Sequence, residues 1–180
     1  DHYLLDLRIA NGFEIIELTQ SVHIQFTDTC SVLQLDLGGP LENGLGMKVL
    51  KVVAPQQALI WQQNTEELLI SLSKVFQKGE TLTLGIELKG KPRDGLIISE
   101  NKYKEATIFA DNWPNRAHYW YACNDHPSDK ATYTFLVESP SIYQVVANGS
   151  LMSKTPKPER NAVLWHYAIN EPIPTKVAVV

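Results

Sequence analysis

The chain has 180 residues, of which 44% are hydrophobic and 20% charged, and its formal net charge is −4. This composition excludes a disordered chain, and the acidic balance excludes a basic nucleic-acid-binding arm or a polybasic membrane patch. No apolar run approaches the roughly 20 residues that a membrane-spanning helix needs, so no membrane span is expected. The length suits one domain with its own hydrophobic core, and we expect residues 1–180 to form a single β-domain.

Apolar residues alternate with polar ones along most of the chain, a pattern that predicts strands. The clearest runs are Tyr3, Leu5, Leu7 and Ile9; Val22, Ile24 and Phe26; Leu33, Leu35 and Leu37; Leu82, Leu84, Ile86 and Leu88; Tyr133, Phe135 and Val137; and Val163, Trp165, Tyr167 and Ile169. Dipeptides typical of turns separate many of them, namely Asn11-Gly12, Asn43-Gly44, Lys78-Gly79, Asp94-Gly95 and Asn148-Gly149. Strands at this spacing predict an all-β fold, an antiparallel β-sandwich or a related sheet assembly.

Two segments are harder to interpret. In residues 66–78 the apolar positions have the spacing of an amphipathic helix. The surrounding strands nevertheless favour a strand over residues 68–72, followed by a loop that carries Val75 and Phe76. Residues 153–159 contain two prolines, which cannot donate hydrogen bonds within a sheet, so we expect an exposed loop there.

The sequence contains few motifs that could carry chemistry. It has no Gly-x-Ser-x-Gly elbow, no phosphate-binding glycine loop and no His-Glu-x-x-His zinc motif. The nearest group of metal-ligand side chains is His118, Cys123, Asp125 and His126. No second pair of metal-ligand type accompanies it elsewhere, so a packed loop without metal is the favoured interpretation.

Aromatic residues are concentrated at Trp113, Tyr119, Trp120 and Tyr121. Such a group could stack on a sugar or a base, but Arg116 is the only basic residue among them, which disfavours nucleic acid as a partner. Packing within the core or an interface is the favoured interpretation.

Residues 112–131 carry the most distinctive pattern, Asn-Trp-Pro-Asn-Arg-Ala-His-Tyr-Trp-Tyr-Ala-Cys-Asn-Asp-His-Pro-Ser-Asp-Lys-Ala. The pattern resembles the hallmark of the M1 family of zinc aminopeptidases, an aromatic-Pro-Cys-x-Asp-x-Pro-x-x-Lys-Ala run. Ala122 stands where that family has proline. The resemblance implies structural roles for the matching residues Cys123, Asp125, Pro127 and Lys130. It gives no indication that Cys123 forms a disulfide with the other cysteine, although one bridge is possible by count.

Further matches to the family follow in order along nearly the whole chain. They are the opening His2-Tyr3-Leu4-Leu5-Asp6-Leu7, Leu33-Gln34-Leu35-Asp36-Leu37, the Lys78-Gly79-Glu80 turn, the Asn148-Gly149 turn and the closing Glu171-Pro172-Ile173-Pro174-Thr175. Each match is short, and the resemblance rests on their occurring in the same order as in the family. In this family the corresponding region is a noncatalytic N-terminal β-domain with saddle-like sheets.

The resemblance implies a partner and a cofactor that lie outside these residues. The partner would be the catalytic domain of the same polypeptide, which binds zinc in the full-length enzyme and hydrolyses peptides. Without His-Glu-x-x-His, the present chain alone is expected to bind no catalytic zinc and to be inactive. Two alternatives stay open: an M1-like scaffold that serves protein interaction, and a free-standing β-sandwich that binds protein or carbohydrate.

The resemblance also implies one loop that helps to hold the free amino group of the substrate. In the family an acidic or amide residue serves there. An ungapped count from Cys123 places that position on Trp113, which has no acceptor, while Asp111 and Asn112 lie beside it. Asp111 is the first choice, because a carboxylate pairs best with an ammonium group.

Overall fold

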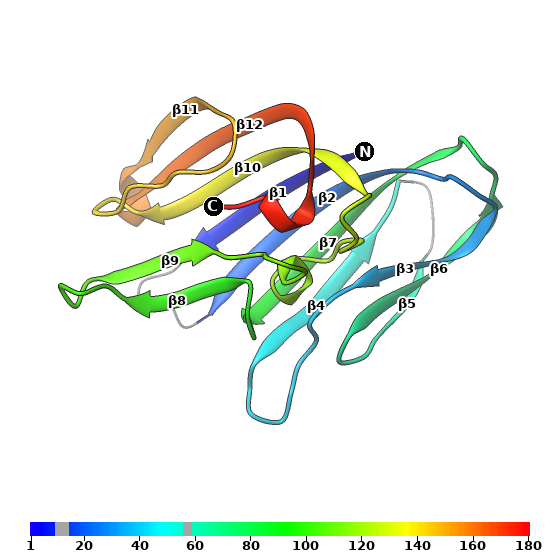
Figure 1. Ribbon diagram of the computed structural model, residues 1–180, viewed down its shortest axis with the longest axis horizontal. Coiled ribbons are helices and arrows are strands. Elements are labelled where there is room, and N and C mark those ends of the chain that lie inside the picture. The colour runs from blue at the N-terminus through cyan, green and yellow to red at the C-terminus, as the bar shows by residue number, and fades with distance from the viewer. Residues whose placement is uncertain (10–14, 56–58) are drawn as a thin grey trace.

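The computed structural model describes residues 1–9, 15–55 and 59–180, and nearly all of its regular structure is strand (Figure 1). The largest sheet has seven strands. In spatial order they are β11 (Ser150–Lys157), β12 (Ala162–Pro174), β10 (Lys130–Pro140), β1 (His2–Ile9), β2 (Ile16–Gln25), β7 (Thr81–Lys91) and β4 (Gly46–Val53). The predicted all-β fold is confirmed.

Two smaller sheets and three short 3-10 turns complete the described structure. The three-stranded sheet has the order β3 (Cys30–Asp36), β6 (Glu67–Phe76) and β5 (Ile60–Gln63). β8 (Leu96–Glu100) and β9 (Ala106–Ala110) form an antiparallel hairpin. The 3-10 turns are η1 (Ala117–Tyr119), η2 (Pro158–Arg160) and η3 (Thr175–Val177).

The alternation in the sequence becomes a buried face and an exposed face in each strand of the large sheet. In β7 the predicted inward set is at most 5% exposed, because successive side chains of a strand point to opposite faces. Its members are Leu82, Leu84, Ile86 and Leu88. The same alternation buries Tyr3, Leu5 and Leu7 of β1.

One pair of neighbours in the large sheet is parallel, which the predicted antiparallel arrangement did not include. β1 runs parallel to β10, from His2 opposite Thr132 to Arg8 opposite Glu138, and antiparallel to β2 on its other side. His2 and Thr132 are 130 positions apart in the chain. Alternation reads the same in both directions along a strand, so no local pattern distinguishes a parallel neighbour from an antiparallel one.

The strand predicted over residues 68–72 is confirmed, but the loop predicted after it is wrong. β6 continues to Phe76, and the ring of Phe76 stacks on Phe26 with the ring centroids 4.6 Å apart. Phe76 is 2% exposed. The burial of this aromatic side chain stabilises the C-terminal end of β6, so the strand continues beyond residue 72.

Residues 153–159 are mostly exposed, as predicted, but the predicted loop is wrong. β11 reaches Lys157, and η2 follows it directly. β11 is the edge of the sheet, where one side of the strand has no neighbour that requires a backbone donor. Pro156 is therefore compatible with the strand, although it would be incompatible with a central one.

Four of the predicted turn dipeptides have the expected backbone geometry. Gly44, Gly79, Gly95 and Gly149 have φ angles between 75° and 88°, a region that favours glycine. Asn11-Gly12 lies outside the described residues.

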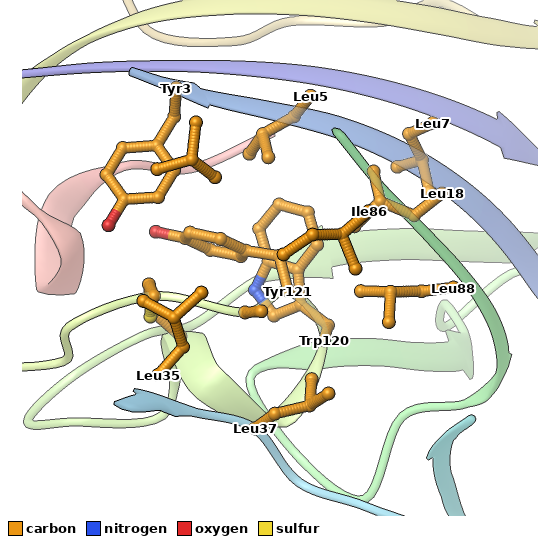
Figure 2. Packing of buried hydrophobic residues seen from close by; sticks show 14 of the residues in the cluster. Tyr3, Leu5, Leu7, Leu18, Leu35, Leu37, Ile86, Leu88, Trp120 and Tyr121 are labelled. Atoms are coloured by element: carbon orange, nitrogen blue, oxygen red, sulfur yellow. The ribbon is translucent and has the colours of Figure 1, made fainter. Parts of the chain in front are cut away.

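The core lies between the large sheet and a second layer that includes β3 and the connection before β10 (Figure 2). Figure 2 shows Trp120 and Tyr121 between Leu5 of β1 on one side and Leu35 of β3 on the other. Both aromatic residues are 0% exposed. They belong to the connection between β9 and β10, residues 111–129, called the 111–129 segment below.

A buried glutamine joins the 111–129 segment to the large sheet. Gln20 occupies an inward position of β2 and is 1% exposed. Its Nε2 donates to the carbonyl oxygen of Ala122 at 2.8 Å, and its Oε1 accepts from the backbone N–H of Ala122 at 2.9 Å. One amide thereby satisfies both backbone polar groups of a residue that is buried in the core.

Gln20→Leu removes this double hydrogen bond and leaves two backbone groups of Ala122 buried without a partner. Each such group costs roughly 1–3 kcal/mol, so we expect a clear loss in the free energy of unfolding, measured by urea denaturation. Gln25→Leu, at an exposed position of the same strand, is the matched control and should change stability by less than about 0.5 kcal/mol. Equal effects of the two substitutions would contradict the assigned role of Gln20.

Candidate functional site

The 111–129 segment begins with two residues that have opposite environments. Asn112 is 1% exposed. Its Nδ2 donates to the carbonyl oxygens of Thr175 at 3.0 Å and Ala178 at 2.7 Å, and its Oδ1 accepts from Trp120 Nε1 at 2.9 Å. The amide of Asn112 is thus committed to the fold, where it links the segment to the residues at and after η3.

Asp111 lies one position earlier and reaches solvent, with its side chain 46% exposed. Its backbone N–H donates to Gly95, and its Oδ2 accepts from Arg116 Nη2 at 2.6 Å. Arg116 also pairs with Asp94 at 3.3 Å. Two carboxylates therefore flank one guanidinium at the start of the segment.

Trp113 is 61% exposed, unlike the other tryptophan of the segment. Its carbonyl oxygen accepts from Arg116 Nε, and the Lys176 ammonium lies 4.9 Å from the centroid of its ring. The peptide bond to Pro114 is cis. Of the three predicted substrate-binding residues, Asp111 and Trp113 thus lie at the surface and Asn112 lies inside; only Asp111 offers an exposed carboxylate.

The centre of the segment is held by Asp125, whose side chain is 4% exposed. Its Oδ2 accepts from the ring and backbone N–H groups of His118 at 2.7 and 3.2 Å, and its Oδ1 accepts from Thr175 Oγ1 at 2.6 Å. Burial opposes ionisation, but these hydrogen bonds outweigh it and lower the pKa of Asp125 below its ordinary value of 3.8.

Cys123 pairs with the end of β3 rather than with the other cysteine. It exchanges backbone hydrogen bonds with Asp36 at 2.8 and 3.1 Å, and both Cys30 and Cys123 are free thiols. Burial, and next the nearby carboxylates, raises the pKa of the Cys123 thiol well above its ordinary value. A thiol in this state is a poor nucleophile, in agreement with a buried structural role.

The remaining residues that match the family motifs lie near the starts of β10 and β11. Pro127 is exposed in a turn before Lys130, which begins β10. Asn148 Oδ1 accepts from the backbone N–H of Val179 at 2.6 Å. Gly149 has φ +88°, and a Cβ there would lie 2.0 Å from a backbone oxygen of β12.

The group of metal-ligand side chains noted in the sequence does not form a metal centre. Throughout the described ranges, no group of three or more His, Cys, Asp or Glu side chains could hold a metal ion. His118 and Asp125 bond to each other, whereas His126 bonds to Ser128 at 2.7 Å on the exposed loop. The packing interpretation of the aromatic group is correct for Trp120 and Tyr121, which are fully buried.

Sequence reasoning missed the residues that position this site. Arg116 and Asp94 are 22 positions apart, and Thr175 is 50 positions from Asp125. No spacing rule relates side chains at such distances. The only available signal was the Asp94-Gly95 turn, which places the aspartate at a chain reversal.

The sequence profile described as the peptidase M1 N-terminal domain matches residues 1–177. The chain belongs to this family. The M1 resemblance noted in the sequence is thus confirmed. Within the described part of this M1 domain, no helix is both long and apolar enough to cross a membrane.

Solved M1 structures share the fold of the domain. The crystal structure of an M1 zinc metallopeptidase from Deinococcus radiodurans is 26% identical with a TM-score of 0.82. A mutant from the same organism, bound to a Tyr-Ser-Ala substrate, gives the same two values, and a two-domain M1 zinc metallopeptidase mutant bound to L-tryptophan gives 25% and 0.83. Each match covers 98% of this chain and 40% of the other. The chain thus spans less than half the length of these structures, and a comparison with curated proteins gives no match.

Asn112→Asp tests whether the amide of Asn112 holds the segment in place. A carboxylate cannot donate to the carbonyl oxygens of Thr175 and Ala178. The Thr175 oxygen keeps its hydrogen bond from the backbone N–H of Ala178, so the main cost, about 1–3 kcal/mol, falls on the Ala178 oxygen. We expect a lower free energy of unfolding in urea. Asn124→Asp, at an exposed position of the same segment, is the control and should have little effect; a similar loss in both variants would argue against the role of Asn112.

Asp125→Asn tests the contribution of the buried carboxylate as a function of pH. Because the folded-state pKa of Asp125 is lowered, its charge stabilises the fold above pH 3.8, and this contribution is lost as the pH falls through the folded-state pKa. We expect the wild type to be more stable than the variant at pH 7 and the difference to shrink on acidification below about pH 4. Urea titrations across this range at constant ionic strength measure the difference.

A stability difference between wild type and Asp125→Asn that is the same at all these pH values would contradict an electrostatic role. Asp28→Asn removes a charge from an exposed residue and controls for the change in net charge.

Proposed function

We propose that this M1 domain packs on a zinc-binding catalytic domain of the same polypeptide and helps to form the site that receives the amino terminus of a peptide substrate. Residues 1–180 would form one noncatalytic unit of that enzyme. The zinc and the side chains that activate water would belong to the catalytic domain. The observation that carries the proposal is the exposed carboxylate of Asp111, at the start of the segment that bears the family motif.

Two features of the fold support packing on a partner. An apolar cavity of about 330 Å³ opens between β1, the β8–β9 hairpin and the residues after β10, and Leu7, Val137 and Val145 line it. Phe109 and Val146, which also line it, are 48% and 74% exposed. A partly open apolar surface of this kind is typical of a contact with another domain.

The outer face of the large sheet has the opposite character. Arg8 and Lys89 both pair with Glu17, at 3.7 and 2.9 Å, in a row of alternating charges across β1, β2 and β7. Charged residues are depleted at the centre of protein interfaces. The catalytic domain is therefore expected against the apolar end of the molecule rather than against this face.

The chemistry of the amino-group site follows from Asp111 and Arg116. A substrate ammonium group carries one positive charge and three donors, which an exposed carboxylate can accept. The guanidinium of Arg116 donates to Oδ2 at 2.6 Å and thereby favours one orientation of the side chain. Arg116 shares its positive charge between Asp94 and Asp111. Asp111 therefore keeps part of its negative charge for a substrate ammonium group.

Asp111→Asn, in the polypeptide that carries this chain with its catalytic domain, tests the proposal. Loss of a charge-assisted hydrogen bond to the substrate costs roughly 1.5–3 kcal/mol, which corresponds to about a 10- to 150-fold rise in KM. Steady-state kinetics with an aminoacyl anilide measure KM and kcat separately. Because the contact exists before and during reaction, we expect kcat to change less than KM.

Asp94→Asn is the matched control, because Asp94 pairs with the same guanidinium. It should leave KM within about twofold of the wild type if Asp111 contacts the substrate directly. Equal KM values for wild type and Asp111→Asn, or equal effects of the two variants, would overturn the role of Asp111. Zinc content and thermal unfolding of each variant show whether the catalytic domain and the fold are intact.

A further inference from the structure

A row of four side chains crosses the central strands of the large sheet. In the sheet register Thr132 of β10 lies opposite His2 of β1, His2 lies opposite His23 of β2, and His23 lies opposite Thr83 of β7. The order across the sheet is therefore Thr-His-His-Thr. Residues from four strands, far apart in sequence, meet in one line.

The two histidines project from the outer face of the sheet. Their chain neighbours Tyr3 and Val22 are 5% and 2% exposed and point into the core, so the histidines point the other way. His2 is partly exposed and His23 is exposed. Side chains directly opposite on antiparallel strands have Cβ atoms about 4.5–5.5 Å apart, which brings the two imidazoles within reach of one ion.

The threonines hold the Nδ1 atom of each ring. His2 Nδ1 lies 2.7 Å from Thr132 Oγ1, and His23 Nδ1 lies 3.1 Å from Thr83 Oγ1. The hydroxyl of Thr132 donates its proton to the carbonyl oxygen of Asp1 at 3.2 Å. Its oxygen must then accept from Nδ1–H of His2, which leaves the lone pair of the neutral ring on Nε2.

This arrangement matches the support that metal-binding histidines require. A ligating imidazole commonly donates its other N–H to a fixed acceptor, which sets the tautomer and the orientation of the ring. We propose that His2 and His23 form a solvent-accessible site for a transition-metal ion, Zn²⁺, Ni²⁺ or Cu²⁺, with Nε2 of each ring as ligand and water in the remaining positions. Two imidazoles and no carboxylate in the row favour these ions over Mg²⁺ and Ca²⁺.

The proposed site is separate from the amino-group site and does not depend on the proposed function. An ion on both rings would cross-link β1 to β2 only in the folded state. It would therefore raise the thermal stability of the domain by mass action. Thr132 would act as a positioning residue, because it touches the ring of His2 rather than the ion.

Calorimetric titration of this chain with Ni²⁺ and with Zn²⁺ tests the proposal, with thermal unfolding in the presence and absence of each ion. We expect one saturable site per chain and an increase in Tm. Thr132→Val should weaken binding about 10-fold, as is typical of outer-shell partners, and His2→Gln and His23→Gln should weaken it more. His126→Gln, on an exposed loop, is the matched control and should bind like the wild type.

Several results would overturn the proposal. A site made by the amino terminus and His2 alone would survive His23→Gln, so retention of affinity in that variant excludes the cross-strand pair. Loss of binding in His126→Gln would place the ion on the loop instead. Absence of saturable binding by the wild type would exclude the site altogether. As a folding control, each variant without metal should have the same Tm as the wild type without metal.

Discussion

The geometry of the candidate site depends on a single buried amide. Asn112 satisfies the indole N–H of Trp120 and the carbonyl oxygens of Thr175 and Ala178 at the same time. Its neighbours Asp111 and Trp113 lie at the surface, so a buried anchor stands between two exposed side chains.

The relative size of the interactions shows which of them orient Asp111. The ion pair with Arg116 is partly exposed, and such pairs contribute about 0–1 kcal/mol. A buried polar group left without a partner costs about 1–3 kcal/mol, and Asn112 prevents this cost at the indole nitrogen of Trp120 and the carbonyl oxygen of Ala178. The buried amide therefore holds the segment, and Arg116 selects only the final orientation of the carboxylate.

The sequence allowed prediction of the features that depend on local pattern. Alternation identified the strands, since burial on one face imposes a period of two, and Gly95 marked a turn that needs a positive φ. Phe76 and Pro156 were misassigned, because their strand positions depend on a distant ring and on the edge of a sheet. Asp111 was chosen for its charge and for its place beside the family position at Trp113, but Asp94 and Arg116 join it only through the tertiary fold.

The parallel pairing of β1 with β10 shows why some chemistry cannot be read from sequence at all. It places Thr132 beside His2, whereas the antiparallel hairpin partner β2 supplies His23. A shift of either pairing by one residue would move one imidazole to the core face, where burial of a polar ring without a partner is costly. The register that buries Tyr3 against Tyr133, with ring centroids 5.2 Å apart, therefore also fixes the row of threonines and histidines outside. One strand register thus determines both the packing of the core and the arrangement of the proposed metal site, and a change of register would disrupt both.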